Sequence, residues 1–169
     1  MFAISMPRLR TAWLALAIAL IAASAMSTSA VAGSPIAHTV KAGGPDACFA
    51  FGARPGCDGN YSLSAIQYTD GSVRGTYTDR FAGNGGIHGF VDCVMVDGNE
   101  AWVSGWITHG QVDGEDLAGL PFTTRVRDNG TSASTFDEVS SSHTGDDTSC
   151  LEQADFDLAA TPQGNVIVK

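Results

Sequence analysis

Residues 88–108 read HGFVDCVMVDGNEAWVSGWIT. Apolar and polar side chains alternate through much of this segment, and alternation with a period of two is typical of β-strands. The polar residues 97–99 (Asp-Gly-Asn) interrupt the pattern near its centre. The segment therefore predicts a β-hairpin, with strands at residues 87–96 and 100–108.

Burial fixes the register that we expect for this hairpin. A two-residue loop would place the charged Asp92 among apolar side chains, so we predict a three-residue loop at residues 97–99. The predicted apolar face then carries Val91, Cys93, Met95, Ala101, Val103, Gly105 and Ile107. The opposite face carries His88, Phe90, Asp92, Val94, Trp102, Ser104, Trp106 and Thr108.

Similar patterns on both sides of the hairpin predict a single all-β domain over residues 59–169. Tyr61, Leu63 and Ala65 alternate with serines, and their run ends at the turn signal Asp70-Gly71. Further strands are expected at residues 73–81 and 122–127 and, as two short strands, between residue 156 and residue 168. The sequence shows no amphipathic helix of ordinary length. About six to eight strands at hairpin spacing indicate an antiparallel β-barrel or sandwich.

The first 32 residues have the pattern of a cleavable signal peptide. Arg8 and Arg10 precede the apolar segment 11–23, and Ala30-Val31-Ala32 forms an A-x-A cleavage site before Gly33. The apolar segment is shorter than the roughly 20 residues that span a bilayer, which disfavours a membrane anchor. We therefore expect a secreted, extracytoplasmic protein that has no membrane segment after signal cleavage.

Residues 33–58, between the signal and the β domain, are rich in small residues at their start. We predict that they form a flexible lead-in with a loop closed by Cys48 and Cys57. The chain that remains after cleavage has the length of one domain with one core.

The four cysteines all follow residue 32, and an even number in an exported chain favours two disulfides. Three pairings are possible. We predict Cys48–Cys57 together with Cys93–Cys150, because residues 49–56 contain the glycines and the proline of a turn that folds back easily. No pair has C-x-x-C spacing, which disfavours redox and zinc sites.

Acidic residues outnumber basic ones by 18 to 9, and the formal charge is −9 at pH 7. Nucleic acids and anionic membranes bind basic patches, so this charge disfavours both as partners. Two groups of acidic residues are close enough together in sequence to suggest a calcium site. They are Asp113, Glu115 and Asp116, and the pair Asp146-Asp147. Neither group has the D-x-[DN]-x-[DN]-G spacing of a calcium loop, so we expect no calcium site and no other cofactor.

The motif H-G-x-V-x-C-x-x-V-x-G-N-x-A-x-V-x-G-x-I-T in residues 88–108 resembles a family of small secreted bacterial domains. These domains are often appended to cell-surface proteins and are termed post-choice-of-anchor modules. Shorter likenesses lie at residues 61–65, 70–73, 126–130 and 164–166, whereas Thr-Phe-Asp at 135–137 departs from a usual Pro-Pro-Asp. The resemblance implies a β domain outside the cell and supports the Cys93–Cys150 pair. It implies no activity and no functional residues.

Catalytic motifs such as G-x-S-x-G, H-E-x-x-H and the P-loop are absent from the sequence. The predicted register places His88 and Asp92 on one strand face, with Ser104 opposite, which is the sole arrangement that resembles an acid–base site. Ordinary cross-strand hydrogen bonding explains this arrangement better. We therefore expect no enzymatic activity.

Phe90, Trp102 and Trp106 are the candidate ligand-binding residues, because the predicted register brings three large rings to one face. We expect the tryptophans to pack in the core, and a groove lining is the alternative. The leading hypothesis is a non-enzymatic module for surface assembly, adhesion or interaction with a protein or another cell-surface component. The alternative is a small-ligand carrier lined by the three rings, and the third hypothesis is an unrecognised hydrolase in which His88 or His143 meets a carboxylate.

Overall fold

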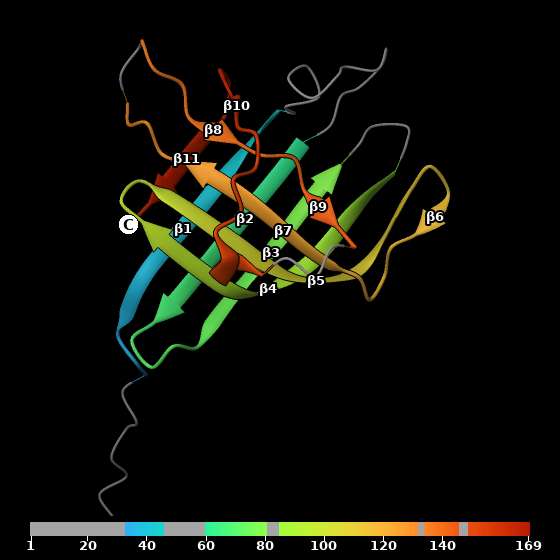
Figure 1. The fold of residues 1–169 in the computed structure, drawn as a ribbon, viewed down its shortest axis with the longest axis horizontal. Helices are drawn as coiled ribbons and strands as arrows, with labels where there is room; N and C mark the ends of the chain where they lie inside the picture. The colour runs from blue at the N-terminus through green and yellow to red at the C-terminus, as the bar shows by residue number, and fades with distance from the viewer. Residues whose placement is uncertain (1–32, 46–59, 81–84, 132–133, 146–148) are drawn as a thin grey trace, which may run out of the picture. The chain divides into compact units, whose positions relative to one another are not determined.

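The computed structural model describes residues 33–45, 60–80, 85–131, 134–145 and 149–169. These residues form one antiparallel sheet and one short 3-10 helix, η3 (Cys150–Glu152), which confirms the predicted all-β fold (Figure 1). The strands are β1 (Ile36–Pro45), β2 (Asn60–Tyr68), β3 (Val73–Arg80), β4 (Gly85–Asp97), β5 (Glu100–Val112), β6 (Glu115–Asp116), β7 (Pro121–Arg127), β8 (Glu138–Val139), β9 (His143–Thr144), β10 (Ala159–Ala160) and β11 (Asn165–Val168).

The sheet curls into a half-barrel with the strand order β10-β8-β7-β5-β4-β3-β2-β1-β11. Two carboxylates connect its ends. Asp137, just before β8, accepts a hydrogen bond from the backbone N–H of Val166 in β11 at 2.6 Å. Asp128, just after β7, accepts one from the N–H of Val168 at 3.1 Å. These bonds occupy edge groups of β11 that could otherwise pair with a foreign strand.

β1 corrects the prediction of a flexible lead-in for residues 36–45, whereas residues 46–58 lie outside the described residues. Residues 36–45 pair with β2 on one side and with β11 on the other. Val40 and Ala42 lie in the core, 0% and 6% exposed. The strand escaped prediction because Gly and Ala are depleted from strands in general, and this strand contains several of them.

The segments 109–120 and 130–149, which lie outside the strands that we predicted, also contribute strands. β5 continues to Val112 and turns back into β6, while β8 and β9 pair with successive parts of β7. The sheet therefore has more strands than the sequence indicated. β6, β8 and β9 have only two residues each, which is too short for a periodic pattern to appear.

The central hairpin departs from its predicted register beside the turn. Asp97 pairs with Glu100, so the loop has two residues, Gly98 and Asn99, and not three. Gly98 has a φ of 59°, which glycine adopts without a steric penalty. A glycine at the first position of a two-residue loop is typical of the tight turns that suit the twist of a hairpin.

A β-bulge at Asp92 explains why the register of a three-residue loop fits one part of the hairpin and the register of a two-residue loop fits the other. Before the bulge, Val91 pairs with Gly105, as the three-residue loop predicted. After it, Val94 pairs with Val103 and is 2% exposed, so the prediction that Val94 lies opposite the apolar face is wrong. The predictions for Cys93 and Met95 are wrong for the same reason, because the extra residue turns both toward the other face. Asp92 itself remains exposed.

The core fills the inside of the half-barrel. Phe122 of β7 is fully buried and stacks on Tyr77 of β3, with the ring centroids 4.9 Å apart. Gly89 makes room for this stack, because a Cβ there would lie 2.8 Å from the Phe122 ring and 2.6 Å from the backbone oxygen of Trp106. Burial raises the pKa of Tyr77 well above its usual range, and its hydroxyl donates to Asp79 at 3.0 Å.

Candidate functional site

The outer face of the sheet, defined as the face opposite the core, carries Trp102, Ser104 and Trp106 of β5. A segment near the C-terminus, Ser149–Phe156, crosses part of this face, and its helix η3 lies against β4 and β5. We term it the crossing segment. Its contacts divide the outer face into a covered part and an open part.

A disulfide and a hydrogen bond fix the start of the crossing segment. Cys93, turned outward by the bulge, is bonded to Cys150, with the Cα atoms 5.9 Å apart. The backbone N–H of Cys150 donates to the hydroxyl of Ser104 at 3.1 Å. The predicted Cys93–Cys150 pair is thus confirmed, whereas Cys48 and Cys57 lie outside the described residues.

Trp102 lies beneath the crossing segment and is only 7% exposed. Its indole nitrogen donates to the backbone oxygen of Ala154 at 2.9 Å. The guanidinium of Arg125, from β7, lies 5.2 Å from the centre of the indole ring, within the range of a cation–π interaction. Trp102 is therefore buried, as we predicted, but under the crossing segment and not inside the half-barrel.

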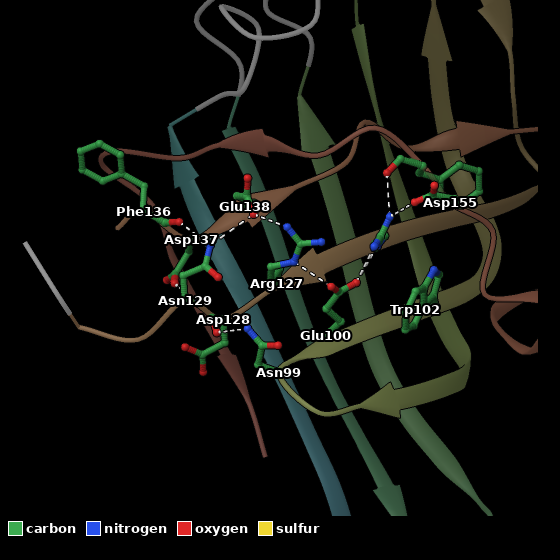
Figure 2. A network of polar contacts seen from close by, with 12 residues as sticks. Asn99, Glu100, Trp102, Arg127, Asp128, Asn129, Phe136, Asp137, Glu138 and Asp155 are labelled. Carbon is green, nitrogen blue, oxygen red and sulfur yellow. Dashed lines mark hydrogen bonds and ion pairs between the residues drawn. The ribbon is translucent and has the colours of Figure 1, made fainter. Parts of the chain in front are cut away.

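Arg125 connects the sheet to the crossing segment through ion pairs with Glu100 and Asp155, which are both labelled in Figure 2. Its Nε donates to Glu100 at 2.8 Å, and its Nη1 contacts the carboxylate of Asp155 and the backbone oxygen of Phe156. Arg127 donates to the other oxygen of Glu100 at 2.7 Å. Burial raises the pKa of Glu100, but the hydrogen bonds from the two arginines act in the opposite direction and lower it overall.

Phe90 and Trp106 occupy the open part of the outer face. They are directly paired across β4 and β5, and they are 46% and 45% exposed. Among the described residues, the indole nitrogen of Trp106 has no hydrogen-bond partner, in contrast to that of Trp102. The prediction of core packing is therefore wrong for Trp106. We term Phe90 and Trp106 the aromatic pair.

Small hydroxyl side chains extend the aromatic pair across the sheet. The register aligns Phe90 with Thr76 of β3, and Thr76 with Ser64 of β2, both exposed. A neighbouring line holds Thr78, His88 and His109, in which the Thr78 hydroxyl lies 2.8 Å from Nδ1 of His88 and the two imidazole rings are 4.8 Å apart. The open part thus combines two apolar rings with hydroxyl and imidazole groups.

The residues of the suspected acid–base site do not come together. His88 contacts Thr78, Ser104 is buried against Cys150, and Asp92 is exposed at the bulge. His143 stacks on Phe156, with the ring centroids 3.8 Å apart. Within the described ranges, no three His, Cys, Asp or Glu side chains are grouped closely enough to hold a metal ion.

The exposed acidic residues considered for calcium lie on a hairpin at one end of the sheet. Asp113 occupies the turn between β5 and β6 with a φ of 51°, and Glu115 and Asp116 form β6. Asp146 and Asp147 fall outside the described residues. Asp116 accepts a hydrogen bond from the N–H of Ala118, so its carboxylate stabilises the local turn.

No family model, curated protein or solved structure matches this chain. In the part of the chain that the structure describes, no helix is both long and apolar enough to cross a membrane.

Sequence reasoning found the three aromatic residues but missed what separates them. The crossing segment, Arg125 and Glu100 carried no motif, because their roles depend on contacts between residues far apart in sequence. One signal was present: Arg125 and Arg127 are closely spaced cations in a chain with few of them. Such residues in a predicted strand require anionic partners, and the first carboxylate of β5, Glu100, supplies one for both.

Proposed function

We propose that this protein is a secreted, non-enzymatic β module that attaches to a cell-surface component through the aromatic pair on its outer face. The observation that carries the proposal is that Phe90 and Trp106 lie side by side and exposed, while Trp102 on the same face is covered. The other exposed large apolar side chains of the described residues lie on other segments: Ile36 on β1, Phe136 between β7 and β8, and Leu151 on η3. Neighbouring exposed aromatic residues are typical of binding surfaces.

Two further observations support export. Residues 1–32 have the pattern of a signal peptide, and residues 88–108 resemble secreted bacterial modules. The Cys93–Cys150 disulfide suits an oxidising compartment, because the cytosol keeps most thiols reduced.

A surface-binding role fits the geometry better than a carrier role. The carrier hypothesis requires the three rings to line the inside of the barrel, but the aromatic pair lies outside. The inside holds the stacked rings of Phe122 and Tyr77. Neither His88 nor His143 forms an ion pair with a carboxylate among the described residues, so no acid–base pair favours a hydrolase.

The direct test measures binding of the purified secreted protein, whose N-terminus should be Gly33, to intact cells of the producing organism. The wild type should bind saturably. The double variant Phe90→Ala/Trp106→Ala should bind at least about tenfold more weakly, because the two rings supply the apolar contact area.

Phe136→Ala is the matched control for this test. Phe136 is 48% exposed, close to the 46% of Phe90, but lies in the connection between β7 and β8. Its removal should leave binding unchanged. Wild-type protein that fails to bind, or a double variant that binds as well as the wild type, would contradict the proposal.

A further inference from the structure

We infer that the open part of the outer face binds an uncharged polysaccharide of the cell surface. This inference rests on the proposed function and names the chemistry of the partner. It depends on the row formed by Ser64, Thr76, Phe90 and Trp106, which the register aligns across β2, β3, β4 and β5.

The aromatic pair supplies the apolar half of such a site. One face of a sugar ring presents mainly C–H bonds, and this face packs well on the flat face of an aromatic ring. Phe90 and Trp106 are neighbours on adjacent strands, about 5 Å apart. They therefore offer two adjacent apolar surfaces to one extended chain.

The hydroxyl groups supply the polar half. The rim of a sugar ring carries hydroxyls, which both donate and accept hydrogen bonds. Ser64 and Thr76 are exposed, and neither hydroxyl has a hydrogen-bond partner among the described residues. Each can donate one bond and accept others, which matches a sugar hydroxyl.

Charge favours a neutral polymer over an anionic one. The chain carries a formal charge of −9, which repels polyanions at long range. The side chains nearest the aromatic pair within the row are uncharged: Thr76 beside Phe90, and Pro121 of β7 beside Trp106. A cation, Lys41, appears only at the far end, beyond Ser64.

The same composition disfavours a protein as the partner. Stable protein interfaces bury about 800 Å² on each side, around a desolvated centre of large side chains. Ser is depleted from such interfaces, yet here the aromatic pair is continued by Thr76 and Ser64. Two large rings beside small hydroxyl side chains suit a narrow polysaccharide chain better than a protein surface.

The test compares binding of the full secreted protein to three preparations of the producing cells. One preparation is untreated, one is treated with periodate, which cleaves the vicinal diols of sugars, and one is treated with protease. We expect periodate to weaken binding at least about tenfold and protease to leave it unchanged. Binding should also survive about 1 M NaCl, where exposed charges are screened.

Two substitutions sharpen the result. Trp106→Phe keeps an aromatic surface and should retain binding, whereas Trp106→Leu keeps only apolar area and should lose about tenfold. A protein partner would accept leucine more readily.

Each outcome decides the inference. Loss of binding after protease treatment, survival after periodate, loss in salt, or equal binding by the leucine and phenylalanine variants would overturn it. In all of these cases the proposed surface-binding function would stand. Untreated cells that bind no wild-type protein would instead overturn the proposed function itself.

Discussion

Trp102 and Trp106 are four residues apart on the same strand and project from the same face, yet their surroundings differ completely. Trp102 is 7% exposed, donates to Ala154 and contacts Arg125. Trp106 is 45% exposed and is paired with the equally exposed Phe90. The crossing segment covers the first residue and leaves the second open.

The difference teaches that the role of a strand residue can be decided by a segment distant in sequence. The alternation of β5 treats Trp102 and Trp106 as equivalent, and on that pattern alone we predicted that both would be buried. Contacts from residues 149–156 make only Trp102 part of the structural framework. The open ring is then available for binding.

Removal of the disulfide should have the largest effect. The double variant Cys93→Ala/Cys150→Ala removes a link across 57 residues, and in the chain-entropy model this lowers the free energy of unfolding by about 4 kcal/mol. Urea denaturation measures the loss.

The same variant should also uncover Trp102. When Trp106 is replaced by phenylalanine, Trp102 is the one indole left after residue 32, so its fluorescence can be followed alone. We expect its emission to shift to longer wavelength once the crossing segment is released. An unchanged emission spectrum would show that the disulfide does not hold this cover in place.

Truncation of the covered tryptophan comes next. Trp102→Ala should lower the free energy of unfolding by about 3 kcal/mol, because it opens a cavity beneath the crossing segment and removes the ring under Arg125. Thermal and urea unfolding both measure this effect. A stability within about 0.5 kcal/mol of the wild type would mean that the contacts of Trp102 contribute little.

Sequence reasoning succeeded where local patterns dominate. The alternation around Tyr61, Leu63 and Ala65 predicted a half-buried strand correctly, and all three side chains are at most 7% exposed. The Cys93–Cys150 pair was also predicted. The strand depends on a signal within a single stretch of sequence. The pairing was predicted from the even number of cysteines, the turn-forming residues between Cys48 and Cys57, and the family resemblance.

The same reasoning did not predict features that depend on contacts between residues far apart in sequence. β1 contains too many small residues to show a strand pattern, and its place is set by β2 and β11 on its two sides. The bulge at Asp92 could not be read from periodicity, because one inserted residue makes each half of the hairpin fit a different register.

A smaller loss of stability is expected for a substitution in the core beneath the open part of the outer face. Gly89→Ala should lower the free energy of unfolding by about 2 kcal/mol, because the added methyl group would collide with Phe122 from the core side. This change tests whether the open part is stabilised from inside and not by a covering segment.

Gly43→Ala is the control for that substitution. Gly43 also lies inside a paired strand, but the nearest atom to its Cβ position is the backbone oxygen of Tyr61 at 3.5 Å, an ordinary contact. Its stability should stay close to that of the wild type. If Gly89→Ala is equally harmless, the packing of Phe122 against the hairpin is looser than the distances indicate.

The smallest effect on stability belongs to Trp106, and it tests the central claim most directly. The measurement determines the free energy of unfolding and the binding to cells of the producing organism on the same preparation of Trp106→Ala. We predict a stability within about 0.5 kcal/mol of the wild type, as for an exposed side chain, together with at least about tenfold weaker binding. A loss of about 3 kcal/mol with unchanged binding would contradict the account, because Trp106 would then be a structural residue like Trp102.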